Sequence, residues 1–149
     1  MQPAAPVFIM PIIKAKGGSM KEAIRYLNNA KELLAKSPIE DNEYTDVKPV
    51  REAFGTMYLA ILEAINEALT EKGFKKKELP KSVDEYRIVL KKHFSVHNGK
   101  LMRKFEHLYD TLHIAGYYRG LICNTVMVKE AFKMSKEFIE KFKLSSRLN

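Results

Sequence analysis

Apolar residues recur once per helical turn along most of this chain, and that periodicity limits the fold more than any other feature of the sequence. Between residues 20 and 34 the apolar side chains stand in steps of three and four, which is the spacing of one helix face. They are Met20, Ile24, Leu27, Ala30 and Leu34. No segment alternates with period two, and no repeat of about 20 to 50 residues is found. The sequence therefore predicts an all-α protein.

Start and stop signals bound the first two helices. Ser19-Met-Lys-Glu22 matches a capping box, and the first helix is expected to stop before Pro38. Residues 37–46 are polar and acidic and are expected to form a loop. A second helix is expected from about Asp46 to Lys72, with Gly73 as its left-handed cap.

The middle of the second helix, residues 57–62, is apolar on nearly every side. Such a helix lies at the centre of a bundle. Gly55 within it is expected to let a neighbouring helix approach closely, which offsets the roughly 1 kcal/mol that glycine costs in a helix.

Signals of the same kind divide the second half of the chain. Ser82-Val-Asp-Glu85 is a capping box for a shorter helix to about His93 or Val96, and Asn98-Gly99 interrupts the chain. Gly116 and Gly120 bracket a bend or connector, and Asn124 is expected to cap the last helix. The expected apolar faces are Leu101, Phe105, Leu108 and Leu112, then Val128, Ala131, Phe132, Ser135, Phe138, Ile139 and Phe142.

These elements predict an antiparallel, up-and-down bundle of four or five helices, because short loops place consecutive helices side by side. The 149 residues suffice for one domain. We expect an irregular extension over residues 1–19, the bundle over 20–144 and a tail over 145–149. The extension is interpreted either as the result of a start codon placed too early or as an arm that docks on a neighbouring subunit.

The apolar run at residues 6–13 is shorter than the ~20 residues of a membrane span, and Lys14 and Lys16 follow it instead of preceding it as in a secretory signal. The sequence therefore predicts a cytoplasmic protein without a membrane partner.

Metal and cofactor chemistry finds little support in the sequence. His93 and His97 share a helix face, but Phe94 stands where a zinc protease would place its glutamate, and no third ligand is identifiable. Cys123, the single cysteine, lies in an apolar setting typical of an inert thiol. We therefore expect neither a metal nor a cofactor.

Two polar groups are candidates for binding. Arg103, Glu106, His107 and Asp110 are neighbours at three- and four-residue steps; they provide either a histidine base beside an arginine or, as we favour, a solvated helix face.

Residues 116–120 are the second group. Tyr117, Tyr118 and Arg119 are suited to stack on a base or a partner side chain and to grip a phosphate. In the alternative interpretation Tyr117 plugs the end of the bundle and Arg119 caps a helix terminus.

The formal net charge of +8 permits an acidic partner without requiring one. Lysines of the chain are concentrated in two groups. One loop contains Lys72, Lys75, Lys76, Lys77 and Lys81, and the last helix carries Lys129, Lys133, Lys136 and Lys143. Glutamates interleave with the second group, which weakens the case for nucleic acid.

The order of these features resembles the HEPN-like bundles of bacteria. The stretches 23–34, 58–69 and 130–139 carry the resemblance, and Leu-His-Ile-Ala-Gly-Tyr-Tyr-Arg-Gly at residues 112–120 is similar to that of a small uncharacterised bacterial family. The resemblance implies a helical bundle that dimerises and, in active HEPN ribonucleases, cleaves RNA without metal through an arginine, a polar residue and a histidine. Arg87 and His93 come nearest to that motif, but Ile88 occupies the polar position.

We therefore expect a bundle that acts by binding a protein or nucleic acid, as a homodimer and without an intact catalytic motif. The alternative function is that of a metal-independent ribonuclease using Arg87 and His93.

Overall fold

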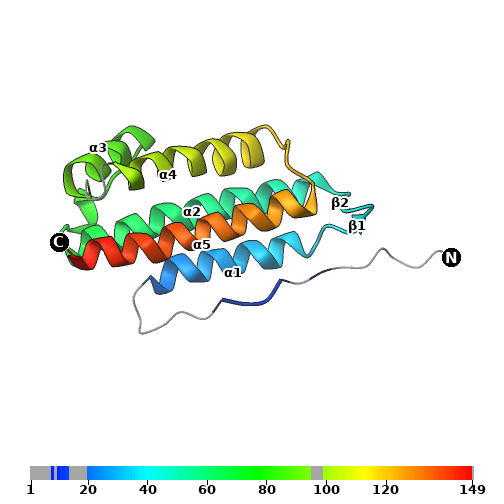
Figure 1. The fold of residues 1–149 in the computed structure, drawn as a ribbon, viewed down its shortest axis with the longest axis horizontal. Coiled ribbons are helices and arrows are strands. Elements are labelled where there is room, and N and C mark those ends of the chain that lie inside the picture. The colour runs from blue at the N-terminus through cyan, green and yellow to red at the C-terminus, as the bar shows by residue number, and fades with distance from the viewer. Residues whose placement is uncertain (1–7, 9, 14–19, 95–98, 149) are drawn as a thin grey trace.

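A computed structural model describes residues 8, 10–13, 20–94 and 99–148. Four long rods alternate in direction along the chain (Figure 1). They are α1 (Lys21–Leu34), α2 (Val47–Glu71), α4 (Lys100–Leu108) continued by the π-helix η2 (Tyr109–Tyr118), and α5 (Thr125–Leu148). The short helix α3 (Val83–His93) and the 3₁₀ turn η1 (Lys76–Glu78) connect α2 to α4. The predicted all-α, up-and-down bundle is confirmed.

Helix α2 is the central element, because it contacts α1, η2 and α5. Its side chains fill the middle of the molecule: Phe54, Met57, Ile61 and Ile65 are fully buried. Each such side chain stabilises the fold by about 1.5–3 kcal/mol relative to leaving it in water. The position predicted for this helix is therefore confirmed.

Three of the predicted helix starts have side-chain caps. The Asp46 carboxylate accepts a hydrogen bond from the Lys48 N–H, and the Ser82 hydroxyl accepts one from the Glu85 N–H. The Asn124 side chain accepts from the Val126 and Met127 N–H groups at 2.9 and 3.2 Å. Each cap satisfies N–H groups that the helix itself leaves unpaired.

Helix α1 starts differently. Met20 adopts a φ of 58° and provides no side-chain cap, while Ser19 of the predicted capping box lies outside the described residues. Glu67 of α2 takes the role, since its Oε1 accepts from the N–H groups of Glu22 and Ala23 at 3.1 and 3.2 Å. Burial raises the pKa of Glu67, although these backbone N–H groups oppose the rise.

The loop predicted at residues 37–46 contains a small antiparallel hairpin, β1 (Ile39–Glu40) and β2 (Glu43–Tyr44). Asp41 and Asn42 make its turn with φ of 50° and 64°. Two-residue strands are too short to show an alternating pattern, so the sequence did not predict them. The Tyr44 N–H donates to Cys123 O at 2.9 Å, which ties the hairpin to the connector before α5.

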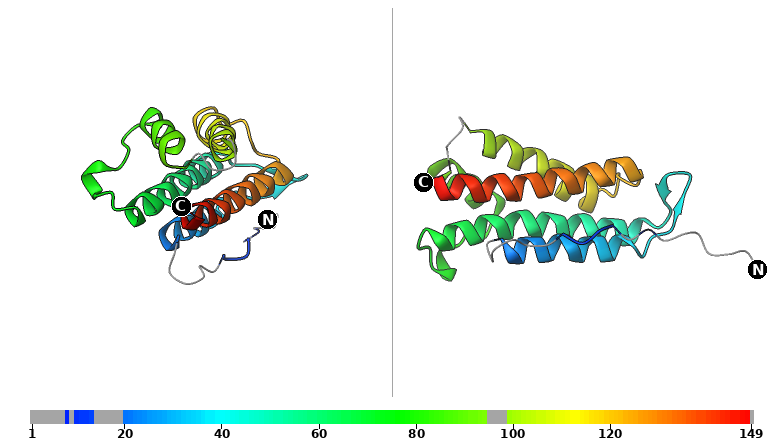
Figure 2. Two further views of the ribbon diagram at one scale, coloured as in Figure 1. Left: turned by 60° about the vertical axis from the view of Figure 1, so that its left-hand side comes forward. Right: turned by 60° about the horizontal axis from the view of Figure 1, so that its bottom comes forward.

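The described part of the N-terminal extension, residues 8 and 10–13, runs beside α1 of its own chain (Figure 2). In this structure the segment packs on the bundle of its own chain.

Candidate interaction site

The helix that begins as α4 continues as a π-helix through the segment predicted to be a bend. Arg119 N–H donates to Ile114 O, five residues back, at 2.9 Å. A π-helix has a wider turn than an α-helix, so residues four apart stay on one face, and Leu112 and Gly116 are both buried. The connector consequently begins at Arg119 and not at Gly116. Such helices are frequent at functional sites.

Two glycines let η2 lie directly on α2. A Cβ atom at Gly116 would stand 2.3 Å from Cδ1 of Phe54, and one at Gly55 would stand 3.0 Å from Cδ2 of Tyr117. The close approach predicted at Gly55 is confirmed, and its partner is the Tyr117 ring.

Aromatic rings form a row along η2. Tyr109, His113 and Tyr117 follow one another at centroid distances of 5.4 and 5.8 Å and are stacked at interplanar angles of 27° and 25°. Tyr58 of α2 packs beside the row, 4.8 Å from the His113 ring, and burial raises its pKa to about 12. The faces of these rings are turned towards one another, so the row holds η2 together and offers little room for an inserted base.

Arg51 of α2 closes the end of η2. Its Nε and Nη2 donate to the carbonyl oxygens of Tyr117 and Tyr118, each at 2.8 Å. Cationic side chains are favourable at helix C-termini, where carbonyl groups lack partners. Arg119, and not Arg51, was expected from the sequence to cap a helix terminus. The available signal was its position one helical turn before Gly55, on the face that meets η2.

The end of η2 and the start of α5 lie at the hairpin end of the bundle (Figure 1), and several apolar side chains of these two stretches are exposed. We call Tyr117, Tyr118, Leu121, Val126 and Met127 the end patch; their exposed fractions are 43%, 70%, 61%, 70% and 54%. The chain has no lysine between Lys104 and Lys129. Arg51 and Arg119 lie beside the tyrosines of this patch, and Lys129 follows Val126 by one helical turn of α5. Tyr117 and Tyr118 were candidates from the sequence, whereas the other three were not.

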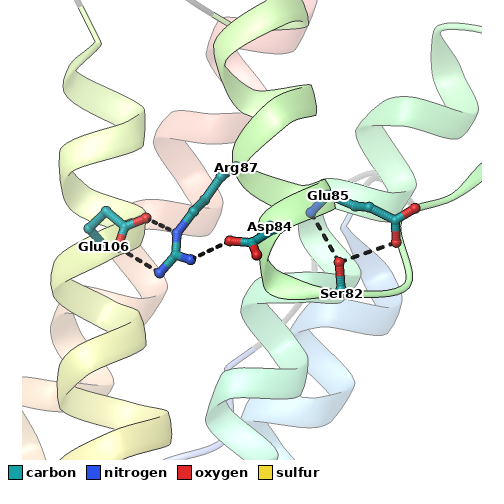
Figure 3. A network of polar contacts seen from close by, with 5 residues as sticks. All are labelled: Ser82, Asp84, Glu85, Arg87 and Glu106. Atoms are coloured by element: carbon teal, nitrogen blue, oxygen red, sulfur yellow. Dashed lines mark hydrogen bonds and ion pairs between the residues drawn. The ribbon is translucent and has the colours of Figure 1, made fainter.

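Arg87 of α3 is held in a network of carboxylates (Figure 3). Its Nε and Nη2 donate to Glu106 of α4 at 2.5 and 3.1 Å, and its Nη1 donates to Asp84 at 2.8 Å. The guanidinium also lies 5.2 Å from the Tyr109 ring centroid. These carboxylates raise the pKa of Arg87 further. The sequence placed Glu106 in a group with Arg103 and His107 of its own helix. In the structure Glu106 instead bonds to Arg87 of α3.

His93, the other residue of the nuclease candidate, makes an edge contact with the Phe74 ring at 5.1 Å. The contacts described for Arg87 and His93 are thus with different partners. His97 lies outside the described residues. Within residues 20–94 and 99–148, no group of three or more His, Cys, Asp or Glu side chains is placed to hold a metal ion.

The cysteine and the two lysine groups singled out from the sequence show no feature of a reactive or binding site. Cys123 is half-buried, and burial raises the pKa of its thiol, which disfavours the reactive thiolate. Of the predicted basic groups, Lys72 lies 5.1 Å from the Phe94 ring centroid and Lys136 pairs with Glu140 at 3.9 Å. In the part of the chain that the structure describes, no helix combines the length and apolarity of a membrane span.

Comparisons with known proteins agree with this fold. A family model described as a domain of unknown function, DUF5618, matches residues 18–143. A solved structure of a protein of unknown function from Dyadobacter fermentans is similar, with 30% sequence identity and a TM-score of 0.68. That match covers 91% of this chain and 100% of the other. A search of the curated proteins finds no match.

Proposed function

We propose, from the premise that this chain belongs to the DUF5618 family, that it is a protein-binding helical bundle whose end patch joins it to a second copy. The end patch carries this proposal. It concentrates five exposed apolar side chains within eleven residues, 117–127. Exposed apolar side chains grouped at one end of a small domain are typical of an interaction site.

The composition of the end patch favours a protein partner over nucleic acid. Tyrosine, methionine and arginine are enriched in protein interfaces, and lysine is depleted in them. Nucleic-acid binding depends on several cations that contact phosphates, whereas exposed apolar side chains predominate in this region, beside Arg51, Arg119 and Lys129. Arg51 is already bonded to the Tyr117 and Tyr118 carbonyls.

A second copy fits the patch because two-fold symmetry requires only one self-complementary surface. In such a dimer the rings of Tyr117 and Tyr118 face their own equivalents, and aromatic pairs contribute about 0.5–1.5 kcal/mol beyond their burial. We further propose that this assembly forms in the cytoplasm.

Light scattering coupled to size-exclusion chromatography tests the dimer. We expect the wild-type chain at tens of micromolar to have about twice its 17.2 kDa mass, and Tyr118→Lys combined with Val126→Lys to have the monomer mass. The matched control is Ile88→Lys, because Ile88 is 62% exposed but lies on α3, away from the patch. A monomeric wild type, or dimers that persist in the double variant, would contradict the proposal. Co-purifying nucleic acid that leaves in high salt would favour the other partner class.

The alternative proposal, a ribonuclease of the HEPN type, rests on the sequence resemblance and the charge of +8. It has less support from the site, because Arg87 is bonded to Glu106 and Asp84 and would have to leave them to reach a phosphate. Incubating RNA with wild-type, Arg87→Ala and His93→Ala proteins tests it. Equal background degradation in all three eliminates the enzyme.

A further inference from the structure

Positive charge is concentrated in one part of the chain. Residues 72–104 contain eleven lysines and arginines and three acidic residues, a net charge of +8 that equals the formal net charge of the whole chain. They include η1, α3 and the start of α4, at the end of the bundle opposite the hairpin, where α5 also ends (Figure 1). We call this the basic end. Its field attracts anions to that end of the molecule.

The three acidic side chains of residues 72–104 already serve local bonds. Glu78 and Glu85 each accept from a backbone N–H beside a helix start, and Asp84 bonds to Arg87. The ion pairs among the described residues involve no lysine of this range. These lysine charges are therefore available to an anion from outside the chain.

The closest approach of like charges at the basic end lies between α4 and α5. Lys104 and Lys141 bring their ammonium groups into contact across the two helices, and Lys100 stands one turn before Lys104 on the same face of α4. Lys104 is half-buried and the other two are exposed. Glu137 of α5 also acts on Lys104, but its effect is smaller than those of the two lysines. We call Lys100, Lys104 and Lys141 the lysine cluster.

The charge of the lysine cluster suits a doubly charged anion with several oxygens. The contact with Lys141, followed by burial and the charge of Lys100, lowers the pKa of Lys104 to about 8. One carboxylate would neutralise only one of the two ammonium groups in contact. A phosphate dianion can neutralise both, because its separate oxygens accept from both groups at once. Lysine commonly binds phosphate in this way, as a point charge with several donors.

We propose that the lysine cluster is a binding site for a phosphate dianion, supplied either as free phosphate or as the monoester group of a small phosphorylated molecule. The ammonium groups of Lys104 and Lys141 donate to different oxygens of the phosphate, and Lys100 adds its charge from the neighbouring turn. A phosphodiester of a nucleic-acid backbone carries a single charge and matches the cluster less well. The cluster lies at the opposite end of the bundle from the end patch, so the proposal does not depend on dimerisation there.

An NMR titration of the full chain with inorganic phosphate, at constant ionic strength, tests the site. We expect saturable shifts in the wild type and about ten-fold weaker binding in Lys104→Gln or Lys141→Gln, because one of two charged donors is lost. Lys91→Gln is the matched control: it removes the same charge from an exposed position of α3, at the basic end but outside the cluster. Absence of saturable binding, or equal weakening in Lys91→Gln, would overturn the proposal.

The titration of Lys104 separates a bound anion from general attraction to the basic end. An anion between the two ammonium groups favours the charged form of Lys104, so its pKa should rise from about 8 towards the ordinary 10.5. Sulfate is the appropriate probe, because it keeps both of its charges over this pH range. NMR of ¹³C-labelled lysine side chains measures this pKa in sulfate and in chloride at equal ionic strength. The same pKa in both salts would contradict a shared anion.

The form of the ligand is tested with two organic phosphates. Glycerol phosphate, a monoester, should bind to the lysine cluster, whereas dimethyl phosphate, a diester with one charge, should bind about ten-fold more weakly. Tighter binding of the monoester than of inorganic phosphate would assign the site to a phosphorylated small molecule, and the reverse order would assign it to free phosphate. Equal binding of the diester would show that the cluster does not select a dianion, and the proposal would fail.

Discussion

Single glycines decide whether η2 can lie on α2. At Gly116 the space for a Cβ is already taken by the body of the Phe54 ring, which is itself fully buried and has nowhere to move. At Gly55 the neighbour is the ring of Tyr117, which is 43% exposed and can shift outward. The same substitution is therefore expected to have different consequences at the two positions.

We predict that Gly116→Ala destabilises the protein by about 1–3 kcal/mol, the usual cost of overpacking a core. Gly55→Ala should cost less, because alanine gains up to about 1 kcal/mol of helix propensity that offsets the displacement of Tyr117. Urea unfolding monitored by circular dichroism gives both free energies. Equal losses for the two variants would show that the contact with Phe54 is no tighter than the contact with Tyr117.

At the scale of elements, the π-helix depends on contacts from outside itself. Its carbonyl end is closed by Arg51, and Gly120, with a φ of 61°, lets the chain turn so that Leu121 N–H donates to Ala115 O at 2.9 Å. Without Arg51, the last turn would rely on solvent to satisfy the Tyr117 and Tyr118 carbonyls.

Arg51→Ala is expected to lower stability by about 1 kcal/mol, the value of a partly solvated hydrogen-bond pair. Amide exchange of Arg119 and Leu121 should accelerate most, since those N–H groups donate within the turn that Arg51 closes. Arg25→Ala is the control, because its ion pair with Glu22 is a surface pair of one helix and contributes little. Unchanged exchange at Arg119 would contradict the proposed closure.

The elements that could be predicted from the sequence are those whose signals are local. Asp46, Ser82 and Asn124 cap helices within a few residues of themselves, so short windows revealed them. Glu67 and Arg51 satisfy helix ends that are distant in sequence. The position of Arg51 one turn before Gly55 indicates its helix face but not its partners, and no local pattern marks Glu67. The site divides in the same way: Tyr117 and Tyr118 stood out between glycines. Val126 and Met127 precede the buried Val128 in an apolar run, where period alone did not show which side chains face solvent.

At the scale of the molecule, two helices bring like charges close together. Lys104 of α4 and Lys141 of α5 bring their ammonium groups into contact, and this contact, with burial and the charge of Lys100 besides, lowers the pKa of Lys104 to about 8. A lysine whose pKa is lower in the folded state than in the unfolded chain opposes folding while it is protonated.

Between about pH 8 and the ordinary lysine value of 10.5, the unfolded chain therefore binds more protons than the folded one, and the Lys104 contribution to stability should rise with pH. Lys104→Gln should remove that rise and increase stability at pH 7 by at most about 1 kcal/mol. Added salt should stabilise the wild type more than the variant. Thermal unfolding at several pH and salt values, with Lys91→Gln as a surface control, measures both effects.

The cap that Glu67 places on the first turn of α1 also has a consequence for folding during translation. The glutamate comes 44 and 45 residues after the N–H groups that it satisfies. A 14-residue helix is marginal in water on its own. The earliest helix to emerge therefore has to wait for most of the second to be translated, so the two should become ordered together as one hairpin.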